Sequence, residues 1–330
     1  MSMRKLKMFT AITLAVIGMI FVLNYGVIGE ISRSILKMKD NSLIYKTSLD
    51  FSEDTPASFP PDMMTPIETE PVSTAPPASA SIVPTTIAGG LNVKNSTSHI
   101  INVKEMLSEG CPVKLKSGKP QILIIHTHSS EAYSPAGLDQ YDDSGGNRTQ
   151  DNNYNVIRIG DELEALLSKQ GLNVIHDRGV YDYPSYTGSY TKCGEAISAY
   201  LESNPSISVV IDLHRDALGS DDVTYKTVAT ETGVCASQLM FVMGSDECGL
   251  EHPNWKGNLS LALYLQNAVM TKYSSLMRPI SLVEYRYNQH LSSGSMILEV
   301  GSNGNTLQEA LAAIRLFADA AGPALLNLVE

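Results

Sequence analysis

The chain has 330 residues, of which 35 are acidic and 24 are lysine or arginine, so its formal net charge at pH 7 is -11. Recognition of nucleic acids depends on clustered basic side chains that release counterions from phosphates, and this charge balance argues against such a partner. Four cysteines, Cys111, Cys193, Cys235 and Cys248, lie far apart with no C-x-x-C pair, so neither a zinc ribbon nor a dense disulfide framework is indicated. A disulfide between Cys235 and Cys248 stays open, but four small, buried, unpaired thiols are the simpler interpretation.

A long apolar run follows a short basic segment at the N-terminus. Residues 1–7 carry three basic side chains, and residues 8–28 (MFTAITLAVIGMIFVLNYGVI) carry no charge. The run is long enough for a helix to cross ~30 Å of hydrocarbon. A cleaved signal peptide would have a shorter apolar region and a small-x-small cleavage site, so we expect an uncleaved transmembrane anchor with a cytoplasmic tail at 1–7. Basic residues also follow the run, and charge alone therefore leaves its orientation open.

The next segment is predicted to be a tether. Residues 54–90 are dense in proline, serine and threonine and short of aromatic residues, so they cannot bury enough apolar surface to offset the entropy of ordering them. Proline-rich composition favours an extended, semi-stiff chain. We therefore predict a linker over residues 29–97 and a folded domain over residues 98–330; that the linker is extracytoplasmic is what the family resemblance described below implies.

The folded domain shows the pattern of an α/β protein. Short apolar runs predict strands at 121–126, 172–177, 206–214, 238–244 and 295–300. Apolar residues at helical spacing predict helices at 154–170, 190–203, 258–273 and 306–318. The strand runs are nearly continuous in Ile, Val, Leu or Met, which is typical of strands buried on both faces. The expected architecture is a mostly parallel sheet with helices on both faces.

Three of the predicted strands end in side chains that bind metals or transfer protons. His126, His128 and Glu131 follow the first strand, Asp212, His214, Arg215 and Asp216 end the third, and Glu299 ends the last. Ligands of open α/β sheets bind at the carboxyl ends of the strands. Catalytic zinc commonly has two histidines and one glutamate as ligands and an open position for water. His126, Glu131 and His214 fit that set, and Glu299 is placed to carry a proton to the leaving group.

Each of these assignments has an alternative. A single histidine at a strand end is usually a structural residue, but charged groups that end several buried strands are costly without partners or a role, which favours a metal site. His126 and His128 compete for one position, because residues two apart in a strand lie on the same side. Glu131 could instead stiffen its loop while Asp151 binds the metal. The purely structural interpretation of Asp151 is that it is a helix N-cap.

Several long motifs together resemble the stage II sporulation protein P family. They are HTHSSEAY, DNNYNVIRIGDEL, VVIDLHRDA, HPNW and RYNQHLSSGSMILEVGSNGNTLQEA, in family order over residues 121–312. The layout also looks like that of the wider family of zinc-dependent N-acetylmuramoyl-L-alanine amidases. The resemblance implies an extracytoplasmic enzyme that cleaves peptidoglycan between N-acetylmuramic acid and L-alanine during spore engulfment. It also implies stage II sporulation proteins D and M as partners and leaves open a second, endopeptidase activity on peptide cross-links.

Carried over to this sequence, the family pattern places Zn2+ on the HTH segment and on His214, and the catalytic carboxylate on Glu299. In the wider amidase family the acidic ligand follows the first histidine at longer range, near the start of a helix. Asp151 therefore remains an alternative to Glu131.

Five further polar residues are expected beside the crevice: Arg215, Asp216, Arg286, Asn288 and Gln289. The first two are interpreted as groups that orient a metal ligand, or as a salt-bridged turn. The last three belong to the RYNQ segment and are expected either to bind the peptide or muramoyl group or to form a structural loop.

A competing function class is a zinc-containing module that binds peptidoglycan or a partner without cutting. Such a module would keep the metal ligands but would need no group to carry a proton. Glu299 separates the two classes, because a carboxylate stands where a hydrolase needs one. The sequence therefore favours an enzyme.

Overall fold

The computed structural model describes residues 81–85, 91–220, 223–231 and 233–330. The predicted cytoplasmic tail, the predicted anchor at 8–28 and most of the predicted linker lie outside these residues. Within the described part of the chain, no helix has both the length and the apolar character that crossing a membrane requires.

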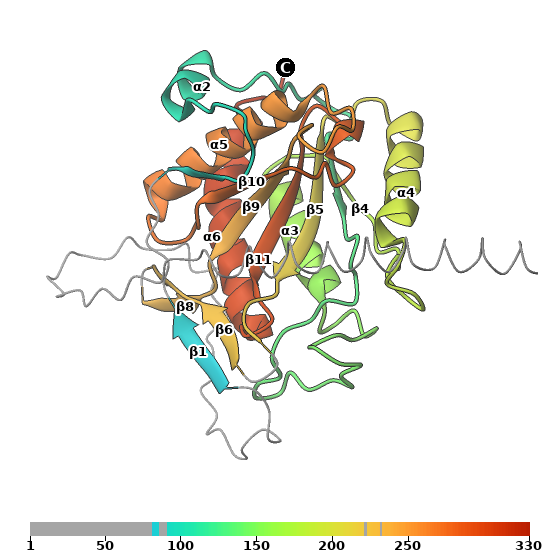
Figure 1. The fold of residues 1–330 in the computed structure, drawn as a ribbon, viewed down its shortest axis with the longest axis vertical. Coiled ribbons are helices and arrows are strands. Elements are labelled where there is room, and N and C mark those ends of the chain that lie inside the picture. Colours follow the sequence, from blue (N-terminus) through green and yellow to red (C-terminus); the bar gives the residue numbers. More distant parts are fainter. Residues whose placement is uncertain (1–80, 86–90, 221–222, 232) are drawn as a thin grey trace, which may run out of the picture. The chain divides into compact units, whose positions relative to one another are not determined.

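A seven-stranded sheet forms the centre of the domain (Figure 1). Its order is β2 (Val93–Asn95), β10 (Ile280–Val283), β9 (Leu239–Gly244), β11 (Ser295–Ser302), β5 (Val209–Asp216), β3 (Ile122–Ile125) and β4 (Val174–His176). Neighbouring strands run parallel, except that β9 and β11 are antiparallel. The predicted mostly parallel sheet is therefore confirmed.

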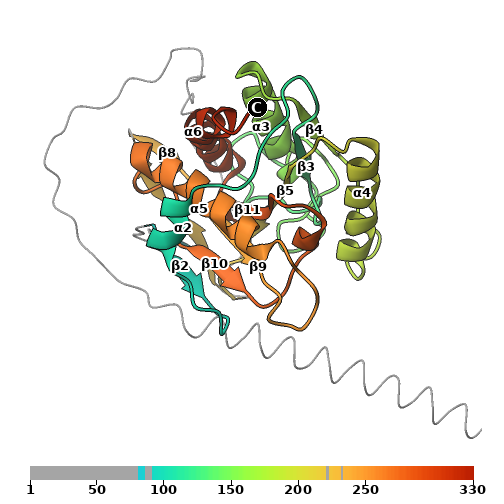
Figure 2. The same cartoon turned by 90° about the horizontal axis from the view of Figure 1, so that it is seen from above.

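Helices cover both faces of this sheet, as predicted. On one face, α3 (Val156–Lys169), α5 (Trp255–Lys272) and α6 (Leu307–Leu326) pack into the main core. On the other face, α4 (Ser189–Ser203) forms a smaller core with the strands, and Figure 2 shows it on the opposite side from α3 and α6. A short helix, α2 (Val103–Glu109), packs against α5.

Strand β3 shows how the sequence holds these layers together. All four of its side chains are fully buried; Ile122 and Ile124 face the main core, whereas Leu123 and Ile125 face α4. This alternation is the natural period of a strand. Full burial of each aliphatic side chain contributes about 1.5–3 kcal/mol, so this short strand binds both helical layers firmly to the sheet.

Two small sheets lie beside the main one. Strand β1 (Ser81–Thr85) pairs in parallel with β6 (Val223–Thr227), and β7 (Ala229–Glu231) pairs with β8 (Val234–Ala236) in antiparallel orientation. Both β1 and β2 fall in the range that composition assigns to the linker. Strands this short take their stability from partner strands far away in the sequence, so local composition does not reveal them.

The four cysteines are free thiols. Cys193 is buried between α4 and the sheet, and burial raises its pKa well above the usual range. Cys235 is exposed, so the expectation that all four thiols are buried does not hold for it.

Candidate active site

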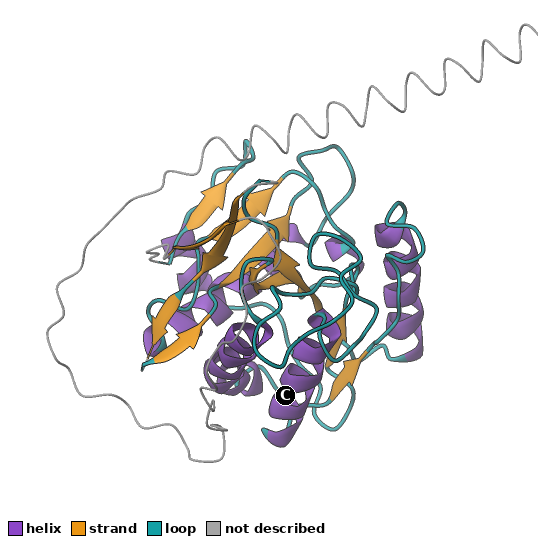
Figure 3. Ribbon diagram, turned by 90° about the horizontal axis from the view of Figure 1, so that it is seen from below, coloured by secondary structure: helices purple, strands orange, loops and turns teal. Residues whose placement is uncertain are grey.

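His214 and Glu299 lie side by side where β5 and β11 pair. The two residues are direct partners in the parallel register, and Asp212 is paired with Ile297 two positions earlier. Because strand residues alternate between faces, Asp212 and His214 share one face, while Leu213 between them joins the main core. The pairing of two strands thus brings an imidazole and a carboxyl group together. Figure 3 looks onto this end of the sheet, where long loops gather.

Glu299 has the properties of an acid–base group. Its Oε2 atom is buried and has no hydrogen-bond partner among the described residues. Burial raises the pKa of Glu299 to about 8, and the nearby Asp216 carboxylate adds to the effect. A carboxyl group with a pKa near neutrality both holds and releases a proton at the pH of the cell.

Two carboxylates hold the ring of His214. Its Nε2 atom lies 2.9 Å from Asp212 Oδ1 and its Nδ1 atom lies 3.3 Å from Glu131 Oε2. Asp212 also accepts hydrogen bonds from the backbone N–H and the hydroxyl of Thr127, at 2.8 and 2.6 Å. Burial would lower the pKa of His214, but the charges of Asp212 and Glu131 outweigh it and raise the pKa well above its usual value. The ring is therefore fixed with Nδ1 toward Glu131.

Glu131 is buried and points into the same site. Its Oε2 atom accepts a hydrogen bond from the backbone N–H of Arg215 at 3.2 Å, and its Oε1 atom lies 3.2 Å from Arg148 Nη2. Burial alone would raise the pKa of Glu131, but the hydrogen bond with His214 and the charge of Arg215 hold it well below the usual range. The group is an ionised carboxylate in contact with an imidazole.

Asp151 has different surroundings. It is exposed, and its side chain accepts hydrogen bonds from the backbone and side-chain nitrogens of Asn153, at 3.0 and 2.8 Å. The N-cap of α3 is Asn155, so Asp151 is not the helix cap either. Of the two carboxylates that the sequence leaves open, the geometry favours Glu131 as a metal ligand.

His128 belongs to this group as well. Its ring stacks on Tyr186 with centroids 4.2 Å apart and lies edge-on to His214 at 5.4 Å. Its Nδ1 atom is buried and has no hydrogen-bond partner among the described residues. Burial lowers the pKa of His128 to about 4, so the ring is neutral near pH 7 and has a nitrogen available for a metal.

His126 points elsewhere. Its Nδ1 atom lies 2.9 Å from the carbonyl oxygen of Leu213, and its Nε2 atom lies 2.8 Å from Nε2 of His176. Strand β3 ends at Ile125, so the alternation that would put His126 and His128 on one side does not continue into this turn. Both nitrogens of His126 are in use, and His128 is the histidine that faces His214.

The residues His128, Glu131, His214 and Glu299 are called the catalytic cluster below. The first three provide two imidazoles and a carboxylate, which is a donor set of catalytic zinc. The free Nδ1 of His128 and the carboxylate of Asp212 behind His214 are features of metal-binding histidines. The residues present thus fit a zinc ion.

A second group, called the edge cluster, consists of Asp161 and Glu164 on α3 and His176 on β4. Its three donor atoms lie within 4.8 Å of one another. Arg178 already contacts both carboxylates, at 2.6 Å from Asp161 and 2.7 Å from Glu164. A metal ion at the edge cluster would have to displace this guanidinium group.

The remaining predicted residues support the loops around the site. Arg215 is buried and donates hydrogen bonds to the carbonyl oxygens of Ala132 and Gly146, at 2.8 and 2.9 Å. Asp216 forms an ion pair with Arg278 at 2.7 Å. These contacts agree with a role in positioning the strand ends.

The RYNQ segment is also engaged with the protein itself. Arg286 donates to the carbonyl oxygen of Glu251 at 2.7 Å, and Asn288 donates to that of Tyr190 at 2.7 Å. The buried Gln289 accepts from the backbone N–H of Gly244 and donates to Val242, both at 2.9 Å. Contact of these side chains with a substrate stays a prediction.

The sequence named Asp212 among the groups that end the third strand but gave it no role of its own. Asp212 stands two positions before His214, so strand alternation could have identified it as a neighbour on the same face. Other residues of the site were not predicted. Arg148, Asp182 and Tyr186 come from irregular loops, and nothing in their local sequence places them beside His128. Arg148 joins the loops through ion pairs with Glu131 and Asp182, each at 3.2 Å.

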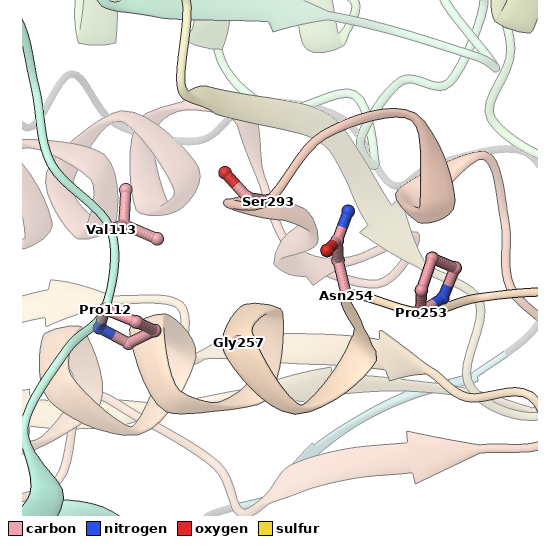
Figure 4. Close-up of a pocket in the computed structure, with 6 residues that line it drawn as sticks. All are labelled: Pro112, Val113, Pro253, Asn254, Gly257 and Ser293. Carbon is pink, nitrogen blue, oxygen red and sulfur yellow. The ribbon is translucent and has the colours of Figure 1, made fainter.

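A pocket of about 210 Å³ lies elsewhere, at the start of α5 (Figure 4). It is lined by Pro112, Val113, Pro253, Asn254, Gly257 and Ser293. None of these side chains titrates near neutral pH, so the pocket offers no acid–base group and no strong metal ligand.

Comparisons with known proteins agree with the sequence motifs. The profile of the family "Stage II sporulation protein P (SpoIIP)" matches residues 64–322. A curated relative, stage II sporulation protein P of Bacillus subtilis (strain 168), is 26% identical over 223 residues, which cover 63% of this chain and 52% of the relative. The match thus spans about half the length of that relative.

Solved structures with a related arrangement include two amidases. N-acetylmuramoyl-L-alanine amidase AmiC2 of Nostoc punctiforme is 16% identical with a TM-score of 0.39, and the match covers 64% of this chain and 97% of that one. An N-acetylmuramoyl-L-alanine amidase from Clostridium difficile 630 is 16% identical with a TM-score of 0.40, over 64% of this chain and 97% of the other.

Proposed function

The chain belongs to the stage II sporulation protein P family, and from this premise we propose that it is a zinc-dependent peptidoglycan hydrolase that cleaves the amide between N-acetylmuramic acid and L-alanine. One observation supports this most strongly. The buried carboxyl group of Glu299 lies beside His214, whose ring is held between Glu131 and Asp212. A set of metal ligands is thereby combined with an acid–base group.

In this proposal each residue has a distinct task. His128, Glu131 and His214 hold the metal, and Asp212 keeps the His214 ring in place. Bound zinc supplies Lewis acidity toward the scissile carbonyl and the attacking water. Glu299 takes a proton from the water and delivers it to the nitrogen of the leaving amine, which otherwise departs poorly.

The wider setting is part of the same proposal. Residues 8–28 anchor the protein in a membrane, and residues 29–97 carry the catalytic domain on the extracytoplasmic side. The enzyme acts during spore engulfment together with stage II sporulation proteins D and M. Digestion of peptidoglycan also tests for a second, endopeptidase activity on peptide cross-links. Family membership and the apolar run at 8–28 support this setting.

The alternative is a zinc-containing module that binds peptidoglycan or a partner without cutting. It would need the metal ligands but would gain nothing from burying Glu299 Oε2 without a hydrogen-bond partner among the described residues, which costs free energy. The unpaired Oε2 atom of Glu299 therefore favours the enzyme.

The test is digestion of purified peptidoglycan by the full-length chain, with and without proteins D and M, followed by mass spectrometry of the released ends. An amidase releases stem peptides that begin with L-alanine, whereas an endopeptidase creates new ends within the cross-links. If neither kind of end forms while the protein still binds peptidoglycan, the binding module replaces this proposal.

A further inference from the structure

Four tyrosines lie in a row of aromatic rings in which His128 of the catalytic cluster stands between Tyr186 and Tyr190. The row, called the aromatic strip here, consists of Tyr186, Tyr190, Tyr287 and Tyr285. His128 contacts Tyr186 at 4.2 Å and Tyr190 at 5.4 Å between ring centroids. Tyr190 lies 5.4 Å from Tyr287, which lies 6.2 Å from Tyr285. The strip thus leads from a proposed metal ligand to the surface.

The two ends of the strip are exposed. Tyr186 is 57% and Tyr285 is 42% accessible to solvent, whereas Tyr190 and Tyr287 are half-buried. Large aromatic side chains give the most stabilisation when they are buried, so exposed rings joined to a candidate active site suggest a binding surface. Packing in the protein core does not account for the exposed rings of Tyr186 and Tyr285.

The fold holds the strip in place across two separate segments. Tyr287 and Asn288 are consecutive residues in the left-handed region, with φ of 44° and 61°. Non-glycine residues rarely adopt this conformation, and such strain persists where the surroundings enforce it, often at functional sites. The side chain of Asn288 donates to the carbonyl oxygen of Tyr190 at 2.7 Å, which ties this turn to α4.

The charges around the strip indicate which part of a substrate it suits. Burial raises the pKa of Tyr287 to about 12, and the nearby Tyr285 and the acidic side chains of Glu299 and Glu284 add to the shift, so acidic groups lie close to its ring. The guanidinium of Arg148, near Tyr186, is already paired with Glu131 and Asp182. Carboxylates of a stem peptide would be repelled here. A neutral sugar would not be repelled. The C–H groups on the face of a sugar ring are attracted to the negative face of an aromatic ring.

We propose that the aromatic strip binds sugar rings of the glycan strand and so orients the substrate over the catalytic cluster. This inference rests on the proposed function, because it takes peptidoglycan as the substrate. It adds that the glycan, rather than the stem peptide, is recognised by the side chains of the strip.

The test measures binding with cleavage disabled. The full-length chain carrying Glu299→Gln is co-sedimented with glycan strands stripped of stem peptides, and a soluble stem peptide is titrated in a parallel experiment. Tyr186→Ala and Tyr285→Ala are each expected to weaken glycan binding roughly 2- to 10-fold, the range of one aromatic contact. Tyr186→Phe and Tyr285→Phe keep the ring and are expected to keep the binding. Leu138→Ala, which removes a side chain that is 92% exposed outside the strip, is the matched control.

Two results would overturn the proposal. One is unchanged glycan binding in both alanine variants that remain folded by circular dichroism. The other is loss of stem-peptide binding with glycan binding intact, which would make the strip a peptide site. If glycan binding depends on the tyrosines but the wild-type chain cuts nothing, the proposed role of the aromatic strip is supported and the proposed hydrolysis is wrong. Failure of the one proposal can therefore be distinguished from failure of the other.

Discussion

The catalytic cluster and the edge cluster contain the same kinds of side chain, yet their surroundings differ. In the edge cluster the carboxylate side chains are 37% and 29% exposed, and Arg178 lies on both of them. In the catalytic cluster the side chains of His214 and Glu131 are only 5% and 7% exposed. Asp212 orients His214 from behind, and Glu299 stands beside it with an Oε2 atom that has no hydrogen-bond partner in the part of the chain that the structure describes.

This difference shows that short distances between donor atoms do not by themselves identify a metal site. The three donors of the edge cluster lie within 4.8 Å of one another, but half-buried carboxylates that arginine already neutralises gain little from a metal. Buried donors that no arginine neutralises are stabilised more by a metal. The orientations of the imidazole rings in the catalytic cluster are also already set. The comparison therefore favours the catalytic cluster as the place for the proposed zinc, and experiments on both clusters can test this choice.

The largest effect is expected from removing a histidine of each cluster. His214→Ala should be purified without zinc and show no hydrolysis, because it loses a ligand. His176→Ala should keep about one zinc per chain. Elemental analysis of both variants measures this directly. Zinc retained in His214→Ala and lost in His176→Ala would move the metal site to the edge cluster.

Glu299→Gln separates catalysis from metal binding within the catalytic cluster. The amide is nearly the same shape but cannot transfer a proton, so turnover should fall about 10²- to 10⁴-fold while zinc content stays normal. The variant should be no less stable than wild type, because an uncharged amide costs less to bury than a carboxyl group that ionises. Hydrolysis at the wild-type rate would remove Glu299 from the mechanism.

Asp212→Asn tests whether the orientation of His214 matters. Loss of a carboxylate behind a metal-binding histidine typically weakens metal affinity about 10- to 100-fold, which competition with a zinc chelator measures. Asp177→Asn is the matched control, because Asp177 accepts hydrogen bonds from Tyr181 and Tyr200 at 2.6 and 3.1 Å, away from His214. Equal loss of affinity in both variants would point to general destabilisation instead.

The sequence predicted those helices and strands whose burial produces an apolar pattern in the local sequence. The four aliphatic residues of β3 and the long amphipathic helices α3 and α6 follow directly from apolar patterns. Strands β2 and β10 were missed, because each is short and its pairing depends on residues far away in the chain. Helix α6 also continues beyond its predicted end at 318 and contains Pro323, since its packing against the core outweighs the local preference of proline.

The site was predictable only where it rests on strands. His214 and Glu299 end apolar runs, and the parallel sheet brings them together. Strand periodicity could not decide between His126 and His128. Strand β3 ends before either residue, and the turn that follows directs the two rings to different neighbours. Tyr186 could not be found either, since its loop reaches His128 only through tertiary packing.

Gly160→Ala probes the packing between His126 and His176 of the edge cluster. A Cβ atom at this position of α3 would lie 2.5 Å from Nε2 of His176 and 2.7 Å from Nε2 of His126. Overpacking of this kind typically costs about 1–3 kcal/mol of unfolding free energy, which chemical denaturation measures. Gly257→Ala is the control, because the nearest atom there is 3.6 Å away. Adding His176→Ala should recover part of the loss; no recovery would mean that the strain arises elsewhere.

The smallest effect is expected from Arg178→Ala at the edge cluster. Its side chain is 47% exposed, and exposed ion pairs contribute about 0–1 kcal/mol, so the unfolding free energy should change by no more than that. Zinc should stay at about one per chain, because the carboxylates of Asp161 and Glu164 are only half-buried and water solvates them once the guanidinium is gone. The informative measurement is elemental analysis of Arg178→Ala beside the double variant Arg178→Ala/His176→Ala. If the single variant bound a second zinc and the double variant lost it, the edge cluster would be a metal site that Arg178 normally blocks, and the two clusters would differ in occupancy rather than in kind.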